Sequence, residues 1–352
     1  MEPSEALARW GRAELIRTAP DAGLINRTWE VGDPPVAILQ WVNPIFKPAV
    51  HLDIEAVTSR LEARGLLTPR LLRTTEGGLW VDDSQGCWRL MSYVPGRTVH
   101  RMDSPARAAT SGALVGRFHA AVAGWSYTFE HCRPGAHDTP RHMDTLRAAL
   151  DEADGHALAA PARAVGEEVL ARWSRWDGTL ELPDRIGHGD LKVSNVRFDE
   201  QGQIALCMLD LDTLAHLPFA VEMGDAWRSW CNPAGEDRPD EAAFDLDLFE
   251  ASASEWLRAA PPLTDLERAS LVPGVERIAL ELSARFCADA VRNTYFREDR
   301  ARHPVAGAHN LLRARGQLNL ARSIAERRAR AEAILASASI AAARDGGRAL
   351  SG

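Results

Sequence analysis

The sequence predicts an α+β fold of two lobes, with a small strand-rich amino-terminal lobe and a larger, mainly helical carboxy-terminal lobe. Its 352 residues exceed what one compact core usually holds, so two lobes are expected. Short strand-like runs dominate as far as Val94, and Pro95-Gly96 then breaks the pattern. Beyond this break, apolar residues recur mainly at helical spacing. We therefore expect an amino-terminal lobe over 1–94, a hinge over 95–98, a helical lobe over 99–335 and a disordered tail over 336–352.

The amino-terminal lobe is predicted to combine short strands with helices. Apolar residues spaced for one helical face predict helices over 4–17, with Ser4 as the N-cap, and over 48–64. The run VAILQWV predicts a buried strand over 36–42. The other strand-like segments are 22–31, which forms a turn between two short strands, 69–72, 79–81 and 87–94. After the first helix, the resulting order is strand, strand, helix and three further strands.

The larger lobe is predicted to be helical apart from one segment. Helical periodicity covers 104–123, 145–153, 162–176, 244–258, 265–286 and 308–335. The segment from Asp190 to Asp210 is expected to supply the only strands of this lobe. The small residues over 337–352 favour a frayed end.

The most informative stretch is IGHGDLKVSNVRFD over 186–199, followed by LCMLDLDT over 206–213. Asp190 could accept a proton from a substrate hydroxyl, while Asn195 and Asp210 could hold Mg²⁺ through oxygen atoms, which this cation prefers. Gly, Asp and Asn also cluster in ordinary turns between strands. However, the D-x4-N spacing, the apolar run over 204–209 and the Asp that ends it agree with one another. Together they favour phosphoryl transfer from ATP.

This pattern resembles that of the aminoglycoside phosphotransferase family, the small-molecule branch of the protein-kinase-like fold. In that family, H-G-D-x-x-x-x-N precedes a short hairpin and an apolar strand that ends in Asp. The resemblance implies a bilobal protein-kinase-like fold, ATP as co-substrate, Mg²⁺ as cofactor and a small-molecule acceptor. It assigns Asp190 and Lys192 to catalysis, Asn195 and Asp210 to the metal, and Asp212 to the metal or to a contact with the substrate.

Three other residues of this region are expected to be structural. His188 should hold the catalytic loop by hydrogen bonds rather than transfer protons. Asp225 and Arg228 resemble the family's G-D-x-x-R and should tie that loop to the helical lobe.

The resemblance also places the nucleotide between the lobes. Its expected contacts are Gly23, Asn26 and Thr28 in the turn over 23–28, Gln40 on the strand over 36–42, and Met91, Tyr93 and Val94 at the hinge. Leu39 and Leu209 are the expected apolar walls. Kinases carry a lysine for the α- and β-phosphates where this chain has Gln40. Another cation is then needed, and Arg27, Lys47 and Lys192 are the candidates.

Several further segments are similar to the N-acetylhexosamine 1-kinase branch of the family. They are GLINRTWEV, ILQWVNPIFKP and IEAVT in the amino-terminal lobe, and RFCADAVRNTYF and HNLLRARGQLNLARSI near the carboxyl end. This resemblance covers residues 20–325 and implies an acceptor site formed by Trp227, Arg285, Asp289, Tyr295 and Arg313, with Trp230 as a further stacking face. Leu24 stands where that branch has a polar residue, and the spacing from Arg285 to Tyr295 is one residue shorter than in that branch.

The expected activity is ATP- and Mg²⁺-dependent phosphorylation of a hydroxyl on a small polar acceptor. The anomeric hydroxyl of a hexose or N-acetylhexosamine is favoured. An aminoglycoside or amino alcohol is the alternative acceptor, and the acidic residues over 236–247 could serve such a cation. A nucleotide-binding pseudokinase that acts as an interaction module is an alternative of another class. Gln40 favours it, while Asp190, Asn195 and Asp210 together argue against it.

Composition argues against several other functions. Acidic residues outnumber basic ones by 49 to 41, for a net charge of −8, so a basic nucleic-acid-binding stripe is not expected. No apolar run approaches a membrane span and the start lacks a signal-peptide core, so we expect a cytoplasmic protein. A monomer or dimer is expected. The five cysteines include no CxxC pair, and the spacing of His131, Cys132, His137 and His142 fits no established metal site.

Overall fold

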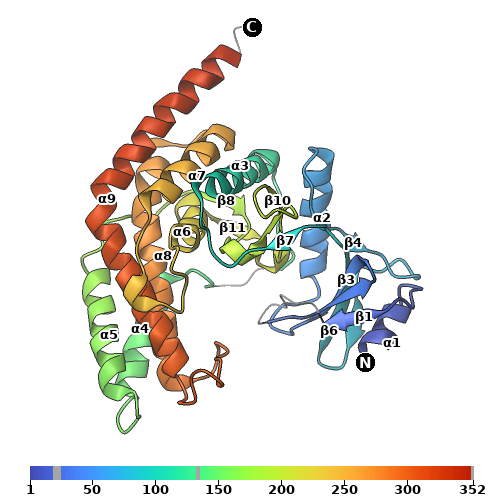
Figure 1. Cartoon of the computed structure of the whole chain (residues 1–352), viewed down its shortest axis with the longest axis horizontal. Coiled ribbons are helices and arrows are strands. Elements are labelled where there is room, and N and C mark those ends of the chain that lie inside the picture. Colours follow the sequence, from blue (N-terminus) through green and yellow to red (C-terminus); the bar gives the residue numbers. More distant parts are fainter. Residues whose placement is uncertain (19–24, 132–134, 350–352) are drawn as a thin grey trace.

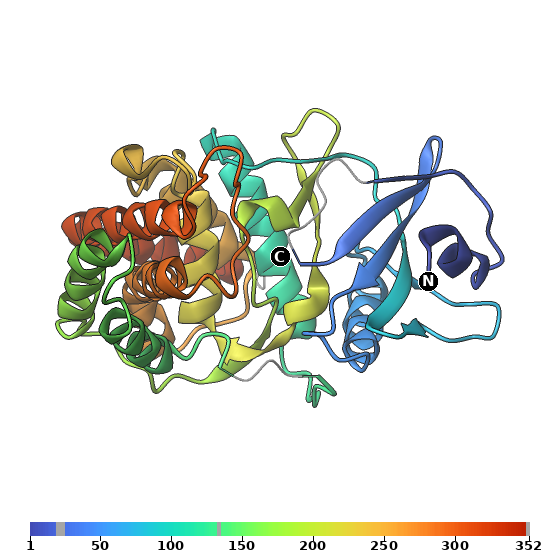
Figure 2. The ribbon, with the colours of Figure 1, turned by 90° about the horizontal axis from the view of Figure 1, so that it is seen from below.

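The computed structural model describes residues 1–18, 25–131 and 135–349, with side chains described as far as Ala342. A small lobe carries the main sheet, and a larger lobe is built mainly of helices (Figures 1 and 2). The predicted α+β fold of two lobes is therefore confirmed. Gly23 and Leu24, both singled out in the sequence, lie outside the described residues, as does Cys132.

Six antiparallel strands form the sheet of the small lobe, in the order β1-β2-β3-β6-β4, with β5 paired to β6. They are β1 (Ile16–Thr18), β2 (Arg27–Gly32), β3 (Pro35–Val42), β4 (Leu71–Leu72), β5 (Val81–Asp83) and β6 (Gly86–Ser92). Helices α1 (Pro3–Ala8) and α2 (Val50–Ala63) lie on opposite sides of this sheet (Figure 1).

Alternation of side chains along β3 gives the sheet two different faces. Ala37 and Leu39 are fully buried in an apolar cluster with Leu7 of α1. Val42 instead joins the main core, together with the apolar side of α2. Gln40 therefore lies on the α2 side of the sheet. The expectation that Leu39 forms a wall of an adenine pocket is wrong, because that side chain is buried against α1 on the other face.

Seven helices of the described chain build the larger lobe. They are α3 (Pro105–Val122), α4 (Thr139–Asp151), α5 (Ala159–Trp173), α6 (Phe219–Trp230), α7 (Leu246–Ala259), α8 (Asp265–Arg292) and α9 (Ala308–Ala349). Helix α8 is buried over most of its length and packs against α4, α5, α6 and α9. Helix α6 begins shortly after the motif segment over 186–213. This packing therefore fixes that segment to the body of the lobe.

Short strands frame the segment that carries the sequence motif. They are β7 (Arg97–Thr98), β8 (Asp184–Gly187), β9 (Val196–Phe198), β10 (Ala205–Met208) and β11 (Ala215–Pro218). Strand β9 pairs with β7 and β10, and β8 pairs with β11. The expectation that 190–210 holds the only strands of the lobe is wrong, because β8 and β11 pair on either side of it. Strand β7 lies inside the predicted hinge and ties that segment to the larger lobe.

The two ends of the chain differ from expectation. The first helix ends at Ala8, with Glu2 rather than Ser4 as its N-cap, and Ile16 begins a strand paired with β2. Gly11 has a positive φ of 66°, which ends helical geometry before residue 17. At the other end, α9 continues through the predicted disordered tail to Ala349 and projects from the lobe (Figure 1). The alanine-rich sequence there favours helix.

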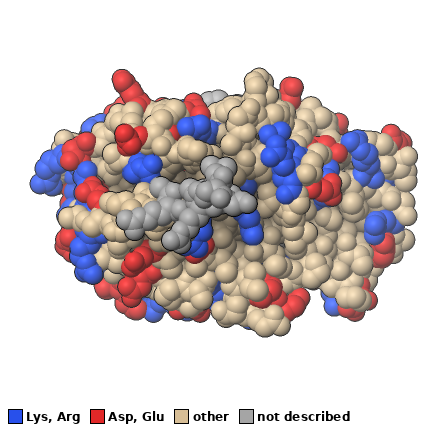
Figure 3. Space-filling view, turned by 90° about the horizontal axis from the view of Figure 1, so that it is seen from above, with Lys and Arg blue, Asp and Glu red and all other residues tan. Residues whose placement is uncertain are grey.

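Within the described residues, none of the helices is long and apolar enough to cross a membrane. Acidic and basic side chains are interspersed over the face shown in Figure 3, without a continuous basic stripe. That face therefore lacks the usual electrostatic feature of a nucleic-acid-binding surface.

Candidate active site

The segment predicted to be catalytic forms a compact loop between β8 and β9, and we call it the catalytic loop. Lys192 donates from Nζ to Oδ2 of Asp190 over 2.5 Å. Asn195 lies in the 3₁₀ helix η1 (Val193–Asn195) and donates from Nδ2 to the carbonyl (2.8 Å) and to Oδ2 (3.0 Å) of Asp190. The structure therefore brings together three of the residues singled out by the sequence. Two donors hold one carboxylate oxygen, so the carboxylate has a fixed orientation.

His188 supports this loop by hydrogen bonds, as expected. Its Nε2 lies 2.8 Å from the carbonyl oxygen of Leu209, while the backbone N–H of Asp190 donates to Nδ1 over 3.3 Å. A ring protonated on Nε2 satisfies both contacts. The ring thus joins the catalytic loop to the end of β10, where the next motif residue begins.

Glu222 of α6 is a support that sequence reasoning missed. Its carboxylate accepts the backbone N–H groups of His188 (2.8 Å) and Gly189 (2.9 Å). It also contacts Nε2 of His119 at 3.2 Å, and Trp256 donates to the other nitrogen of that ring. An acidic residue three positions before Asp225 of the G-D-x-x-R pattern was the available signal. Its partners are backbone groups, which residue types alone do not reveal.

The charge of Lys192 governs the ionisation of Asp190. Burial alone would raise the pKa of Asp190, but the adjacent ammonium holds it below its ordinary value. Burial opposes the charge on Lys192 as well, and the carboxylates of Asp190 and Asp210 nevertheless keep its pKa above the ordinary value. Both groups are therefore charged near neutral pH. A carboxylate of this kind is a weak base, and it suits orientation of a hydroxyl better than early proton removal.

Asp210, which follows β10, is the carboxylate of the candidate site that stays available. It is exposed to solvent, adopts a left-handed backbone (φ 60°) and accepts no hydrogen bond from the described residues. Its pKa is raised to about 6 by the surrounding protein and by the neighbouring charges of Asp212 and Asp190. Excess negative charge at an accessible carboxylate is what a divalent cation would neutralise.

Asn195 and Asp210 together fit a divalent cation. Because Asn195 donates through Nδ2, its Oδ1 is left for a ligand. Mg²⁺ is usually bound by one or two protein oxygens, with phosphates and water completing the shell. The described residues contain no ready-made cluster of three or more His, Cys, Asp or Glu side chains for a metal. A cation at this pair would therefore need oxygens from a nucleotide.

Asp212 was predicted as a third metal ligand, but the structure pairs it with Arg89. Arg89 on β6 donates to both carboxylate oxygens, one of them over 2.9 Å, and Asn26 donates to Oδ2 over 2.7 Å. Burial would raise the pKa of Asp212, but the guanidinium lowers it below its ordinary value. Sequence reasoning missed Arg89 as the cation beside Gln40. The available sign in the sequence was that this charged residue lies inside the apolar run CWRLMSYV.

The residues predicted for the nucleotide lie along the lobe boundary. Gln40 donates to the hydroxyl of Thr28 across β2 and β3 over 3.1 Å. At the hinge, Arg197 of β9 donates to the carbonyl of Val94 (3.0 Å) and to the hydroxyl of Tyr93 (3.0 Å). Met91 is buried in the main core on the α2 side of the sheet. The roles of these residues toward a nucleotide stay predictions.

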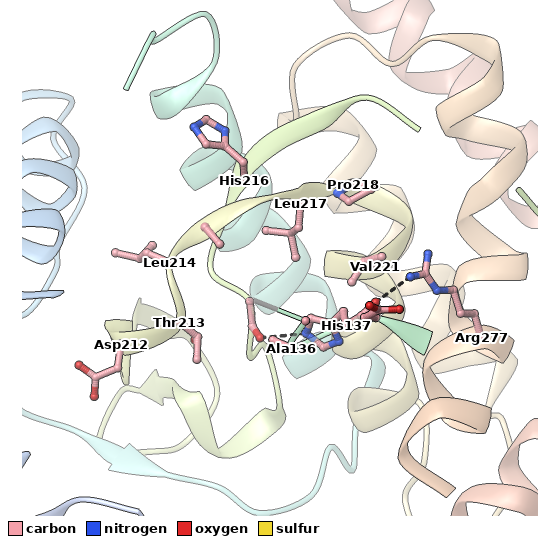
Figure 4. Close-up of a pocket in the computed structure, with 14 residues that line it drawn as sticks. Ala136, His137, Asp212, Thr213, Leu214, His216, Leu217, Pro218, Val221 and Arg277 are labelled. Atoms are coloured by element: carbon pink, nitrogen blue, oxygen red, sulfur yellow. Dashed lines mark hydrogen bonds between the residues drawn. The ribbon is translucent and has the colours of Figure 1, made fainter. Parts of the chain in front are cut away.

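A cavity of about 320 Å³ lies beside the catalytic loop (Figure 4). Its walls come from 135–138, Gly189, the segment 212–218, Val221 and Arg277. His137 lies between Thr213 and Arg277 in this view. Its Nε2 is 3.3 Å from the carbonyl of Gly189, so one side of the cavity is connected directly to the catalytic loop.

An ion pair with the buried Glu281 fixes the charge of His137. Its Nδ1 lies 3.0 Å from Oε1 of Glu281 on α8, and Thr139 donates to the other oxygen over 2.6 Å. Burial opposes the charge on the ring, but the carboxylate raises the pKa of His137. In turn, the ring lowers the pKa of Glu281 to about 2 despite its burial. Arg277 donates to the hydroxyl of Thr139 and to the carbonyl of His137, both over 2.8 Å.

Four of the residues predicted to bind the acceptor lie at the ends of α8 and α9 or between them. Arg285 lies over the rings of Tyr295 (5.8 Å) and Phe296, and Tyr295 is 43% exposed. Asp289 accepts the backbone N–H groups of 294–296 and the amide of Asn310, so its oxygens shape this turn. Arg313 donates to the carbonyl of Arg297 over 3.1 Å.

The two tryptophans predicted as stacking faces are core residues. Trp227 is fully buried with its ring edge-on to Phe249 (5.0 Å) and Trp256 (5.7 Å), and Trp230 donates to the carbonyl of Leu191 over 2.8 Å. Their assignment to an acceptor site is wrong. The α6 face that carries both residues packs against α7 and the catalytic loop. Helical spacing alone does not distinguish such a face from a pocket lining.

Replacement of Trp227 tests this correction. Trp227→Ala is expected to lower the free energy of unfolding by about 3–5 kcal/mol, because it leaves a cavity in a packed aromatic cluster. Chemical denaturation followed by circular dichroism measures this change. An unchanged stability would instead mean that the ring is not part of the core.

Comparison with known proteins identifies the architecture. A model of the phosphotransferase enzyme family matches residues 17–262. A microcompartment-associated aminopropanol kinase superimposes with a TM-score of 0.62 at 18% identity, covering 94% of this chain and 98% of that one. An aminoglycoside phosphotransferase from Alicyclobacillus acidocaldarius gives 0.57 at 16% identity, covering 98% and 97%. Amicoumacin kinase, solved with AMP-PNP and Ca²⁺, gives 0.58 at 13% identity, covering 86% and 87%. These structures confirm the predicted protein-kinase-like fold.

Proposed function

The chain belongs to the phosphotransferase enzyme family and is a small-molecule kinase, and we propose that it uses ATP and Mg²⁺ to phosphorylate a hydroxyl of a small sugar. The favoured acceptor is a hexose or N-acetylhexosamine, with the anomeric hydroxyl as the site of transfer. The observation that carries the proposal is the joint arrangement of Asp190, Lys192, Asn195 and Asp210 around one loop.

Each of these side chains has a distinct part in phosphoryl transfer. Asp190, whose carboxylate is oriented by two donors, accepts a hydrogen bond from the acceptor hydroxyl. Lys192 beside it supplies positive charge toward the transferred group, whose oxygens carry the developing negative charge. A cation held by Asn195 and Asp210 would supply further charge neutralisation on the phosphates. The binding of both substrates in line accounts for most of the expected rate enhancement.

The size of the cavity beside the catalytic loop supports a small acceptor. Its volume of about 320 Å³ lies near the lower end of the range for small-molecule sites, about 300–1,000 Å³. A monosaccharide suits this size better than a compound of several rings. The charged His137 and Arg277 also border the cavity. Sugar hydroxyls can both donate and accept hydrogen bonds beside these side chains.

An amino alcohol is the second candidate acceptor. The buried Oδ2 of Asp225 has no hydrogen-bond partner among the described residues, although Arg228 donates to Oδ1. An ammonium group that reached Oδ2 would be stabilised by this carboxylate. The fold is also shared with an aminopropanol kinase.

A coupled assay of ADP release tests the proposal. The protein is incubated with ATP, Mg²⁺ and a panel of hexoses, N-acetylhexosamines, amino alcohols and aminoglycosides. We expect turnover with a monosaccharide and none with an aminoglycoside. Turnover with amino alcohols alone would transfer the assignment to the second candidate. ADP binding without turnover on any member would support the pseudokinase alternative and contradict the proposal.

Metal binding at this site is expected to weaken at acidic pH. Asp210 has its pKa raised to about 6, so it gains a proton, and loses its charge, as the pH falls through that value. Below about pH 6, protons then compete with the cation, and the apparent Mg²⁺ affinity should fall by up to about tenfold per pH unit. Calorimetric titration of ADP at several Mg²⁺ concentrations, from about pH 5 to about pH 8, measures the effect. An affinity that stays constant down to about pH 4, the ordinary value for Asp, would contradict this assignment.

A further inference from the structure

The register of the small-lobe sheet places an arginine directly across from the position where kinases carry a lysine. Gln40 of β3 pairs with Arg89 of β6. Nε of Arg89 donates to Oε1 of Gln40 over 2.8 Å, so the glutamine orients the guanidinium. The other end of the same amide donates to Thr28, which fixes its own orientation. The missing charge on β3 is therefore present one strand away, on the same face of the sheet.

Arg89 crosses the lobe boundary. Its side chain is 1% exposed and that of Asp212 is fully buried. Both terminal nitrogens of Arg89 donate to the carboxylate of Asp212, which lies in the 3₁₀ helix η2 (Leu211–Thr213) of the larger lobe. Asn26 reaches the same carboxylate from the start of β2 and accepts the backbone N–H of Asn43 over 3.0 Å. The resulting network joins three strands of one lobe to a single carboxylate of the other.

This network ends two residues from the carboxylate that is available to a cation. Asp210 directly precedes η2 and has the left-handed backbone that begins it. A shift of Asp212 would therefore rotate the backbone that presents the Asp210 carboxylate. Arg89 is too deeply buried to meet a ligand, and each of its three nitrogens already donates to Gln40 or Asp212. Arg27, a candidate from the sequence, instead lies over the ring of Trp41 at 5.1 Å.

We propose that Arg89 is a positioning residue that lies beside the place of the strand lysine but acts on Asp212, without contacting the nucleotide. It holds Asp212, and through η2 it fixes the Asp210 carboxylate in the orientation that binds a divalent cation and its phosphates. The inference rests on the proposed function, since it assumes that nucleotide and metal bind between the lobes. It also gives Asp212 a role different from that of a metal ligand.

A double-mutant cycle on the full-length protein tests the proposal. Arg89→Met, Asp212→Asn and the double variant are compared with the wild type. Arg73→Met serves as the matched control, because Arg73 is 56% exposed and lies in the same lobe. Calorimetry gives the affinity for ADP at a series of Mg²⁺ concentrations, and urea denaturation gives stability. Arg89→Lys keeps a positive charge beside the Asp212 carboxylate. It therefore provides a variant that folds if Arg89→Met does not.

Each single variant is expected to weaken Mg²⁺-dependent ADP binding by about 10–100-fold, the usual effect of removing a residue that orients a metal ligand. The double variant should recover stability, because it leaves no buried charge unpaired. Its affinity for ADP should nevertheless equal that of either single variant. Arg89→Lys should show a smaller loss, and Arg73→Met none.

Two results would overturn the assignment. If the loss from Arg89→Met adds in full to that from Asp212→Asn, Arg89 contacts the nucleotide directly. If ADP affinity recovers together with stability in the double variant, the pair is merely structural. A wild-type protein that shows no Mg²⁺-dependent ADP binding would be a different result, which contradicts the proposed function itself and removes the basis of this inference.

Discussion

Asp190→Ala is expected to lower kcat by about 10²–10⁴-fold while leaving the affinity for ADP and Mg²⁺ within about twofold of the wild type. The carboxylate is the group that orients the acceptor hydroxyl, and it is itself oriented by Lys192 and Asn195. Its removal therefore affects transfer rather than nucleotide binding. Steady-state kinetics with the best acceptor gives kcat, and calorimetry gives the ADP affinity.

Asp190→Asn is the matched variant for this experiment. It preserves the shape of the side chain and the contact with Asn195, but it removes the charge that pairs with Lys192. We expect nearly the same loss of kcat as for the alanine variant. Substantial turnover by either variant would mean that another group orients the acceptor. A loss of ADP binding equal to the loss of kcat would mean that Asp190 belongs to the nucleotide site instead.

Gly189→Ala is expected to lower the free energy of unfolding by about 3–5 kcal/mol and kcat by at least about 10²-fold. Gly189 has a φ of 79°, which L side chains rarely adopt, and an added Cβ would overlap the carbonyl oxygen of Thr213. Thr213 also donates to the carbonyl of His188 over 2.8 Å, so the two segments cannot separate without loss of this contact. The catalytic loop would have to shift away from η2.

Gly65→Ala separates the two causes of this effect. Gly65 has nearly the same φ, 73°, but an added Cβ would meet nothing within 4 Å. We expect a loss of about 1–2 kcal/mol from the backbone conformation alone, with unchanged kcat. Equal losses for the two variants, measured by urea denaturation, would mean that the close approach of the catalytic loop to Thr213 is not as the structure has it.

Local pattern predicted most of the larger elements. The helices that became α2, α3 and α8 and the strand that became β3 have strong apolar periodicity, and they begin close to their predicted positions. The first helix was predicted too long because Ile16 continues its apolar pattern. In the structure, Ile16 instead pairs with Val31 of β2, which is distant in sequence. Strands β8 and β11 have four residues each, too few for periodicity to identify them.

The site was predictable where one short segment supplies several side chains. Asp190, Lys192 and Asn195 are within six residues, and the structure brings them into contact. Arg89 was missed because its partner Asp212 is 123 positions away. Trp227 was misassigned because a buried helix face and a ligand-binding face have the same apolar spacing. Long-range pairing and burial are properties of the fold, and the sequence alone leaves them open.

Mass spectrometry of the acceptor tests the central claim most directly. The wild-type protein is incubated with ATP, Mg²⁺ and each monosaccharide of the panel, with Asp190→Ala as the parallel control. We expect one monosaccharide to gain a single phosphoryl group, in an amount equal to the ADP formed, and no product with the variant. ADP formation without a phosphorylated acceptor, or equal product from Asp190→Ala, would contradict the claim that this chain is a small-molecule kinase with Asp190 at its catalytic centre.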